Sequence, residues 1–368
     1  MAITKPIKNL LGYGINTKPT YVFGKSIGEA QEEWGGTDLA RLGSNENAYG
    51  PSPKSVEAIC QEALEANRYP DPTGLKLKTL LANKHGLTIE NFALSNGSAD
   101  LMAVISRVFV CPGDEVVMAA PTFSEYKTQA VFNQGTAVVI NIDEETYELD
   151  LDAMFAAVNE KTKMVWICNP NNPTGVAVNG DKLEAFIKKL PEEVVVVLDE
   201  AYIEFVDDPS YRSMIHLIQD YNVIILRTFS KFYGLGAMRL GYCVARTEIT
   251  DCINAHITSF PVSSLSLAAA CAAYTDEEYQ KKVYEGITRD RKFCREELEK
   301  LGWKVYPSQT NFYFVDPHNM TSVELTDKLL TKGIIIRGNF RFPRITVGTR
   351  EENERLVQAC REIAEEMK

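Results

Sequence analysis

The chain has 368 residues, of which 45% are hydrophobic, and a formal net charge of −11 at pH 7. This length and apolar content are sufficient for a large core divided between two unequal domains. The excess of acidic residues disfavours nucleic acid and anionic membranes as general partners, because like charges repel. We therefore expect a globular protein with no nucleic-acid partner and no membrane partner.

The first ten residues and the cysteines indicate the compartment. Lys5, Pro6 and Lys8 interrupt the apolar residues at the start of the chain, so the continuous stretch of a signal peptide is missing. The eight cysteines show no C-x-x-C spacing, and the four histidines lie far apart in the sequence. We expect a cytoplasmic protein with reduced thiols and no metal site.

Residues Phe92 to Val244 alternate short apolar runs with longer amphipathic segments, a pattern typical of a parallel α/β sheet. Near-continuous apolar runs suit strands that are covered on both faces. The four candidate strands are Glu115–Ala119, Met164–Cys168, Val194–Leu198 and Val223–Leu226. We expect an α/β fold with a large ligand-binding domain at residues 51–265, in which helices cover a mostly parallel sheet.

The two ends of the chain predict a second, smaller domain. Residues 1–50, which are rich in Gly, Asn and Pro near Gly43, are expected to form an N-terminal arm and part of this domain. Residues 266–368 are expected to form the rest, with an α+β fold. The elements expected there are a helix over Asp276–Leu301, strands at Asn311–Val315 and Gly333–Arg337, and a closing helix after Arg350.

Four polar clusters each follow an apolar run, and open α/β sheets bind ligands at the carboxyl ends of their parallel strands. In the first cluster, Ser95–Asp100, a glycine permits a tight turn, and the free N–H groups of the following helix suit a phosphate. The alternative is an ordinary turn with a helix cap.

In the second cluster, Asn169–Gly175, two prolines restrict the backbone, so that Asn172 would be held against a ring substituent. The alternative is a surface turn.

The third cluster, Asp199–Tyr202, places an acid at the rim of a hydrophobic sheet, where it is costly without a cationic partner. A protonated pyridine nitrogen would be such a partner, and the pair would make the ring an electron sink. A helix N-cap formed by Asp199 is the alternative.

The fourth cluster runs from Thr228 to Arg239 and contains Lys231 among serine, glycine and aromatic residues. A desolvated amine near a positive charge has a lowered pKa and becomes a nucleophile that can form a Schiff base. Arg239, with the hydroxyls of Thr228 and Ser230, would hold a dianionic phosphate. The four clusters agree in predicting one ligand site at one edge of the sheet.

At these residues the chain resembles the fold type I pyridoxal-phosphate enzymes, and within them the histidinol-phosphate aminotransferase family of class II aminotransferases. The resemblance covers nearly the whole chain and implies pyridoxal 5′-phosphate as cofactor. Seven motifs occur in family order: K-P-T-Y-V-F-G-K from Lys18, S-N-E-N-A-Y-G-P-S-P from Ser44, R-Y-P-D-P from Arg68, P-N-N-P-T-G, D-E-A-Y-I-E-F, R-T-F-S-K, and R-I-T-V-G from Arg344.

The resemblance implies roles for the residues that match the family pattern. Lys231 would form the Schiff base and transfer protons, and Asp199 would pair with the pyridine nitrogen. Asn172 and Tyr202 would bond the ring oxygen, and Phe123 would stack on the ring where the family usually has tyrosine. The phosphate would be held by the backbone of Ser98 and Ala99, by Thr228, Ser230 and Arg239, and by Tyr69 donated from the second subunit of a homodimer.

The resemblance also implies substrate contacts. Arg344 matches the arginine that takes the substrate α-carboxylate as a bidentate pair. Tyr21 and Asn45 align with residues that close over the substrate. Arg337 is a candidate for the phosphate of histidinol phosphate, and a surface or interface arginine is the alternative. The implied reaction is ping-pong transamination between histidinol phosphate and 2-oxoglutarate.

Departures from the family pattern gather near the substrate and keep other reactions open. They are Ala48, Ala99, Asp100, Pro261 and the segment Gly338–Pro343, which is shorter than in many members of the family. An aromatic amino acid aminotransferase would need an apolar pocket where histidinol phosphate needs a second anion site. A lyase that decarboxylates threonine phosphate would break a different bond at the same cofactor.

Overall fold

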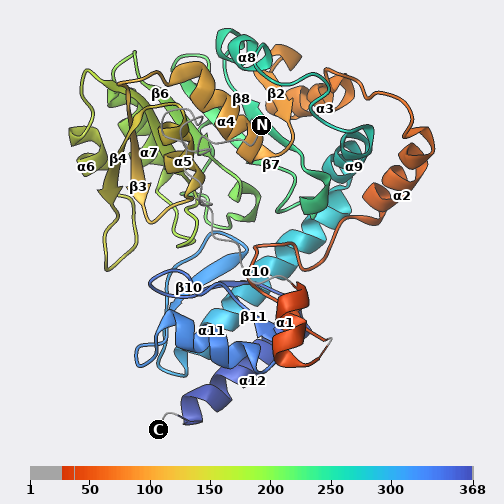
Figure 1. The fold of residues 1–368 in the computed structure, drawn as a ribbon, viewed down its shortest axis with the longest axis vertical. Helices are drawn as coiled ribbons and strands as arrows, with labels where there is room; N and C mark the ends of the chain where they lie inside the picture. The colour runs from red at the N-terminus through yellow and green to blue at the C-terminus, as the bar shows by residue number, and fades with distance from the viewer. Residues whose placement is uncertain (1–26, 37, 367–368) are drawn as a thin grey trace, which may run out of the picture.

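The computed structural model describes residues 27–36 and 38–366, which form a larger and a smaller lobe (Figure 1). Tyr21 lies outside the described residues. The larger lobe contains a seven-stranded sheet in the order β2-β8-β7-β6-β5-β3-β4. Its neighbouring strands are parallel except where β8 pairs with β2 and β7. The expected α/β class with a mostly parallel sheet is confirmed.

The strands of this sheet are β2 (Phe92–Ser95), β3 (Glu115–Ala120), β4 (Thr136–Asn141), β5 (Thr162–Cys168), β6 (Val195–Asp199), β7 (Val223–Thr228) and β8 (Gly241–Val244). The four strands expected from apolar runs agree with β3, β5, β6 and β7 to within two residues at each end. The other three were not among the expected strands. The short apolar run before the first polar cluster proves to be β2, but β2 and β8 are only four residues long, and the edge strand β4 is only partly buried.

Successive residues of the central strands enter two separate cores, which explains their continuous apolar sequence. In β6, Val196 and Leu198 belong to one core, whereas Val195 and Val197 belong to the other. This alternation follows from the two-residue period of a strand. The first core includes side chains of α3 (Leu75–His85), α6 (Leu151–Ala156), α7 (Gly180–Lys189) and α9 (Ser264–Thr275). The second includes side chains of α4 (Ser98–Phe109), α5 (Glu125–Phe132) and α8 (Thr247–Asn254).

The smaller lobe combines segments from both ends of the chain. β1 (Ala40–Arg41) pairs in parallel with β11 (Ile334–Ile335), so the N-terminal segment lies beside the C-terminal part. A three-stranded antiparallel sheet has the order β12-β10-β9. The other elements of this lobe are α1 (Ile27–Trp34), α10 (Glu277–Glu299), β9 (Lys304–Val305), β10 (Phe312–Asp316), α11 (Ser322–Leu330), β12 (Arg344–Thr346) and α12 (Arg350–Glu366).

The contacts of helix α9 indicate where the boundary between the two domains lies. It packs against α2 (Pro53–Glu62) and α3 of the larger lobe, whereas the following helix α10 leads down into the smaller lobe (Figure 1). We therefore propose that the domain boundary lies at the start of α10, about ten residues after the expected boundary at residues 265 and 266.

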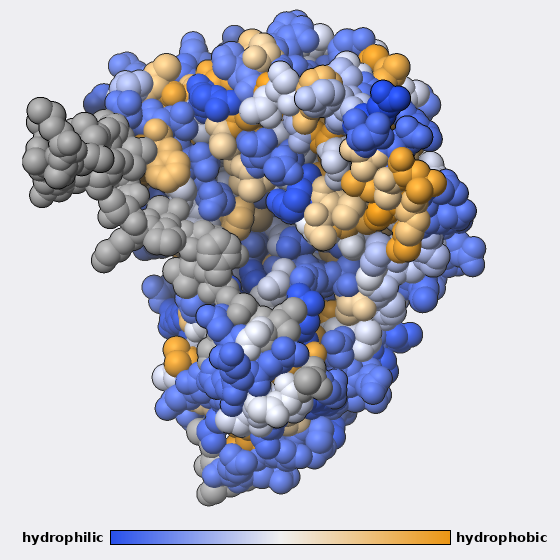
Figure 2. All heavy atoms as spheres, turned by 45° about the vertical axis from the view of Figure 1, so that its right-hand side comes forward, coloured by the Kyte–Doolittle hydropathy of each residue, from blue (hydrophilic) through white to orange (hydrophobic). Residues whose placement is uncertain are grey.

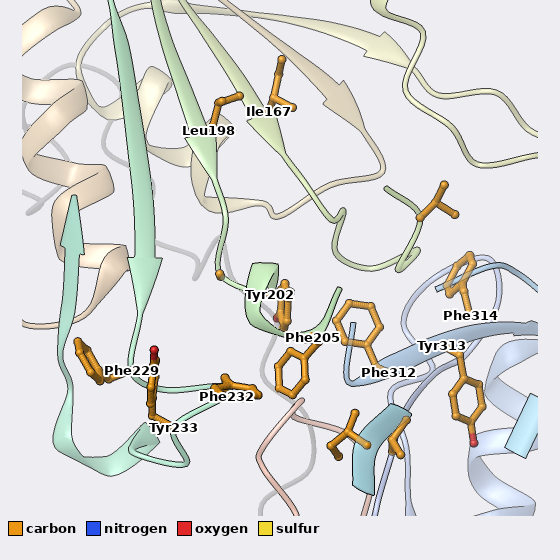
Figure 3. Close-up of a cluster of buried hydrophobic side chains, with 14 of the residues drawn as sticks. Ile167, Leu198, Tyr202, Phe205, Phe229, Phe232, Tyr233, Phe312, Tyr313 and Phe314 are labelled. Atoms are coloured by element: carbon orange, nitrogen blue, oxygen red, sulfur yellow. The ribbon is translucent and has the colours of Figure 1, made fainter. Parts of the chain in front are cut away.

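A continuous hydrophobic core joins the two lobes. Figure 3 shows Tyr202 and Phe205, which follow β6, beside Phe312 of β10 and Phe232 of the loop after Lys231. The rings of Tyr202 and Phe312 meet edge to face with centroids 5.0 Å apart, and those of Phe205 and Phe232 do so at 5.3 Å. The segments that carry Asp199 and Lys231 are therefore held against the smaller lobe.

Membrane-spanning helices and metal-ligand clusters are both absent from the described part of the chain. No helix in residues 27–36 and 38–366 combines the length and the apolar character needed to cross a membrane. In the same ranges, no three His, Cys, Asp or Glu side chains are grouped as the ligands of a metal ion would be.

The loop after Lys231 depends on Gly234, which has φ of +68° and a hydrogen that faces the carbonyl oxygen of Gly50. We expect Gly234→Ala to lower the free energy of unfolding by about 3 kcal/mol, because a Cβ would be strained there and would overlap this backbone oxygen. Gly86→Ala is the matched control, since Gly86 has φ of +65° and a Cβ there would meet nothing within 4 Å. It should cost only about 1 kcal/mol in urea unfolding; equal losses would contradict the contact with Gly50.

Candidate active site

A cavity of ≈ 200 Å³ lies where the carboxyl ends of β5, β6 and β7 face the smaller lobe. It brings together thirteen of the fifteen predicted site residues from distant parts of the sequence. They are Asn45, Ser98, Ala99, Phe123, Asn172, Asp199, Tyr202, Thr228, Ser230, Lys231, Arg239, Arg337 and Arg344. The position at strand ends agrees with the general rule for open α/β sheets.

Two predicted residues do not line this cavity. Tyr21 is outside the described residues. Tyr69 lies before α3 on the surface of the larger lobe, where 83% of it is exposed. Its ring stacks on that of Phe260 with centroids 4.7 Å apart. Tyr69 therefore does not contribute to the cavity of its own chain.

Asp199, the last residue of β6, forms the acidic end of the cavity. It is 3% exposed, and its carboxylate accepts hydrogen bonds from the Tyr126 hydroxyl at 2.7 Å and the Ala201 N–H at 3.1 Å. Burial raises the pKa of Asp199 to about 6, because desolvation penalises the charged form. Within residues 38–366 no basic side chain forms an ion pair with it. It does not cap a helix either, because the next helical turn begins at Ile203 with Tyr202 as its cap.

Lys231 lies in the loop after β7, and its Nζ donates to the carbonyl oxygen of Ser44 at 3.2 Å. Burial lowers the pKa of this amine to about 8, and the positive charge of Arg344 acts in the same direction. A larger fraction of the amine is consequently uncharged near neutral pH than in an ordinary lysine. Ser44 belongs to the segment that enters the smaller lobe, so both lobes shape the surroundings of Lys231.

The opposite end of the cavity offers an anion site. Ser98 is the first residue of α4, and its helix presents free N–H groups and a positive dipole end. Arg239 lies beside it, and its guanidinium donates to Ser230 Oγ at 3.4 Å. Gly97 has φ of +92°, and a Cβ there would lie 2.5 Å from Arg239 Nη2. The glycine thus makes room for the arginine at the start of the helix.

Arg344 is part of a polar network that crosses between the lobes. Its guanidinium donates to Asn172 Oδ1 at 2.6 Å and to the carbonyl oxygen of Gly43 at 2.7 Å. Asn45 Nδ2 donates to the Tyr202 hydroxyl at 3.0 Å. Burial raises the pKa of Tyr202 above its usual range, so the hydroxyl stays protonated.

Arg337 is also drawn into the cavity. It is 8% exposed, and its backbone pairs with that of Arg344 through hydrogen bonds of 3.1 and 2.9 Å. Its Nε donates to Asn339 Oδ1 at 2.7 Å. Arg337 is therefore not a surface arginine of this chain, and it lines the cavity together with Arg239 and Arg344.

Several residues in or behind the site were not predicted from the sequence. Those that line the cavity are Gly43, Ser44, Met102, Cys168 and Ala201. Glu200 and Arg227 form a buried ion pair at 2.8 Å behind the cavity, where they join the ends of β6 and β7. Glu200 and Arg227 lie within the D-E-A-Y-I-E-F and R-T-F-S-K motifs, so the motifs could have indicated that these two residues belong near the site. Tyr126 had none.

The sequence and the structure are both similar to known proteins. The family model for aminotransferase class I and II matches residues 37–360. The histidinol-phosphate aminotransferase of Brevibacillus brevis is 41% identical over 351 residues, which are 94% of this chain and 96% of that protein. The chain belongs to the histidinol-phosphate aminotransferase family.

Solved structures agree with this family. The crystal structure of histidinol-phosphate aminotransferase from Sinorhizobium meliloti in complex with pyridoxal-5′-phosphate has a TM-score of 0.90 and 29% identity, and covers 100% of this chain and 99% of that one. The L-threonine-O-3-phosphate decarboxylase from Porphyromonas gingivalis has a TM-score of 0.77 at 22% identity, with 89% of this chain and 100% of that one covered. The second likeness concerns the fold alone, so the fold does not separate a transaminase from a decarboxylase.

The residues of the cavity fit pyridoxal phosphate. Asp199 is a buried carboxylate whose described partners are a hydroxyl and a backbone amide, which leaves its charge available for a cationic ring nitrogen. The start of α4 and Arg239 suit a phosphate at the other end. Lys231 supplies the amine of lowered pKa that an aldehyde requires.

The lowered pKa of Lys231 gives a pH prediction. The rate at which protein stripped of cofactor captures pyridoxal phosphate should rise as the pH increases through about 8, because only the uncharged amine attacks the aldehyde. Stopped-flow absorbance across the neutral and alkaline range measures this rate. Lys231→Ala should lack the pH-dependent phase, and a midpoint near the ordinary lysine value of 10.5 would contradict the effect of burial.

Proposed function

We propose that the chain transfers the amino group of histidinol phosphate to 2-oxoglutarate, as a pyridoxal-phosphate-dependent aminotransferase. The observation that carries the proposal is the arrangement of one cavity. It holds the buried acid Asp199, which has no basic partner among the described residues, the amine of Lys231 with its lowered pKa, and three arginines, of which one lies beside the start of α4 and two lie on the smaller lobe. Membership of the histidinol-phosphate aminotransferase family supports the same reaction.

The amine of Lys231 is the group suited to move protons in this cavity. When bound, pyridoxal phosphate supplies an aldehyde that carries the amino group and a ring that withdraws electrons from the substrate Cα. With a pKa of about 8, Lys231 exchanges a proton readily near neutral pH, which suits a general base and acid. The carbonyl oxygen of Ser44 orients the amine by accepting one of its hydrogens.

Other side chains would hold the ring. Asp199 would pair with the ring nitrogen and keep it protonated, because a buried carboxylate favours a neighbouring cation. Asn172 and the protonated Tyr202 hydroxyl would donate to the ring oxygen. Phe123 lines the same cavity and would cover one face of the ring, where its lack of a hydroxyl leaves stacking intact.

The phosphate would bind at the start of α4. The backbone N–H groups of Ser98 and Ala99 have no partner within the helix and would donate to the phosphate there. Arg239 and the hydroxyls of Thr228 and Ser230 line the cavity on the same side. Charge-assisted hydrogen bonds from these groups would fix the cofactor against the large lobe while the substrate reacts.

Two arginines favour an enzyme with two anionic substrates. Arg344 would take the α-carboxylate of 2-oxoglutarate or glutamate as a bidentate pair, after releasing Asn172 or sharing its bond. Arg337, buried beside it, would take the phosphate of histidinol phosphate. An aromatic amino acid aminotransferase would place an apolar group near Arg337, where a charged guanidinium is poorly matched. Asn45, which bonds Tyr202, would close over the substrate.

A half-reaction separates the candidate amino donors. The cofactor-loaded protein is mixed separately with histidinol phosphate, phenylalanine, tyrosine, or threonine phosphate, and the absorbance of the bound cofactor is followed. We expect histidinol phosphate to convert the cofactor to pyridoxamine phosphate fastest. Arg337→Gln should raise the concentration of histidinol phosphate needed for the half-maximal rate by at least about tenfold, because a charged hydrogen bond to its phosphate is lost. The same half-reaction with glutamate, which has no phosphate, should change far less.

Each other outcome of this experiment contradicts part of the proposal. Conversion by phenylalanine or tyrosine without conversion by histidinol phosphate would indicate an aromatic aminotransferase. Release of carbon dioxide from threonine phosphate, with no conversion by any amino donor, would indicate a lyase. Lys231→Ala is the control for the chemistry and should give no conversion with any donor.

We propose in addition that two copies of the chain share their active sites. The larger lobe exposes Val56, Leu64, Tyr69, Leu75 and Phe260, each more than 40% exposed. Figure 2 shows hydrophobic atoms gathered on the side of this lobe where α2 lies. An exposed apolar group of this kind is typical of an interface, and a two-fold dimer would bring Tyr69 of one copy to the phosphate site of the other.

Subunit mixing tests the shared site. Lys231→Ala and Tyr69→Ala are each expected to have little activity at limiting cofactor. After the two variants are unfolded together and refolded, mixed dimers contain one site with both Lys231 and the partner's Tyr69. Random pairing should therefore restore up to about one quarter of the wild-type activity. Sedimentation as a monomer, or no recovery on mixing, would contradict a shared site.

The cysteines support a reducing compartment. All eight have free thiols, and five of them are buried. Proteins that keep buried thiols unpaired are typical of the cytoplasm, where thiols stay reduced. We propose the cytoplasm as the location.

A further inference from the structure

Tyr126 contacts the acid of the site without lining the cavity. It lies in the first turn of α5, is fully buried, and donates its hydroxyl hydrogen to Asp199 Oδ2 at 2.7 Å. The other carboxylate oxygen, Oδ1, accepts from the Ala201 N–H at 3.1 Å. Each oxygen of Asp199 thus has one donor from the protein, and Tyr126 is the only side chain among the described residues that provides one.

The ring of Tyr126 is fixed by its neighbours. It stacks on Trp166 of β5 with centroids 4.7 Å apart and an interplanar angle of 9°. The ring of Phe123 meets it edge to face at 5.8 Å and 79°. Trp166 is 1% exposed, so this stack is itself held in the core. The packing of the ring therefore directs the hydroxyl at Asp199, at little further cost in side-chain entropy.

Asp199 needs such a donor because a small further rise in its pKa would protonate the carboxylate near neutral pH. Burial raises its pKa to about 6, and the negative charge of Glu200 adds to this rise. The Tyr126 hydrogen bond, the Ala201 amide and the charge of Lys231 act in the opposite direction. Cys168 and Tyr202 also face Asp199, and burial raises the pKa of both above their usual range, which keeps them uncharged. A rise of one further unit would protonate about half of Asp199 at pH 7.

We propose that Tyr126 is a positioning residue that keeps Asp199 ionised and oriented toward the cationic ring nitrogen of the cofactor, and thereby sets cofactor affinity and its pH range. This inference rests on the proposed function, because it requires pyridoxal phosphate in the cavity. It adds to that function a residue that does not line the cavity and acts on the cofactor through its hydrogen bond to Asp199.

Tyr126→Phe tests the proposal, because it removes one hydroxyl and keeps the stacked ring. The dissociation constant of pyridoxal phosphate is measured by absorbance titration over a series of pH values. We expect binding about tenfold weaker than in the wild type at pH 7, as for loss of a hydrogen bond to a charged group. The pH below which affinity declines should rise by about one unit, because Asp199 then takes up its proton at higher pH.

Tyr313→Phe is the matched control. Tyr313 is 1% exposed, lies on β10 of the smaller lobe and does not line the cavity. This variant loses a buried tyrosine hydroxyl at a distance from Asp199, so its cofactor affinity and pH profile should equal those of the wild type. A change equal to that of Tyr126→Phe would overturn the proposal, because it would reflect a general effect on packing.

A double-mutant cycle distinguishes positioning from structure. In an Asp199→Asn background the charge that Tyr126 supports is absent, so Tyr126→Phe should change the cofactor dissociation constant by less than about twofold. An equal loss in both backgrounds would assign Tyr126 a merely structural role and overturn the proposal.

A second variant is available if Tyr126→Phe does not fold. Trp166→Phe keeps the Tyr126 hydroxyl but weakens the stack that directs it, so it should shift the pH profile in the same direction by a smaller amount. No shift would overturn the proposal.

The wild type separates the failure of this inference from that of the proposed function. If the wild type shows no Lys231-dependent absorbance with pyridoxal phosphate, both fail. If the wild type binds the cofactor and Tyr126→Phe matches it in affinity and pH profile, the role of Tyr126 alone is wrong.

Discussion

The cost of burying negative charge at the ends of β6 and β7 governs the arrangement of the site. Asp199 and Glu200 are neighbours in sequence, and each is 3% exposed. Glu200 is paired by the protein itself, through Arg227 at 2.8 Å and the Ser213 hydroxyl at 2.8 Å. Asp199 receives hydrogen bonds but no basic side chain within the described residues. One of two adjacent acids thus stabilises the scaffold, and the other keeps its charge for a ligand.

Because the charge of Asp199 is kept for a ligand, the cationic side chains of the cavity contact uncharged oxygens instead of this carboxylate. Lys231, Arg239 and Arg344 all line the cavity, yet each is directed to a carbonyl, hydroxyl or amide oxygen and none to Asp199. An ion pair with Asp199 would neutralise the charge that the cofactor nitrogen needs. The mutual repulsion of these cations also contributes to the low pKa of Lys231, so the same separation of charges serves both the acid and the amine.

Much of this site could be predicted from the sequence, because its residues follow strands in short contiguous motifs. Asp199 and Lys231 each come within three residues of a strand end, where side chains from different strands converge. Ser44 and Tyr126 could not be found in this way, since they reach the site through packing between segments distant in sequence. The short strands β2 and β8 were missed for a related reason: four residues give too little periodicity to distinguish a strand from a loop.

The aromatic core between the lobes has a consequence for how such enzymes diversify. Tyr202 of the larger lobe packs on Phe312 of the smaller lobe, and Asn45 bonds the same tyrosine. Neither lobe can therefore be exchanged with that of a relative as an independent module, because the exchange would replace one half of a joint core. Substrate preference in this architecture is instead free to change at Arg337 and Arg344, whose side chains line the cavity, whereas the loop between them is tied to the core by the rings of Phe340 and Phe342.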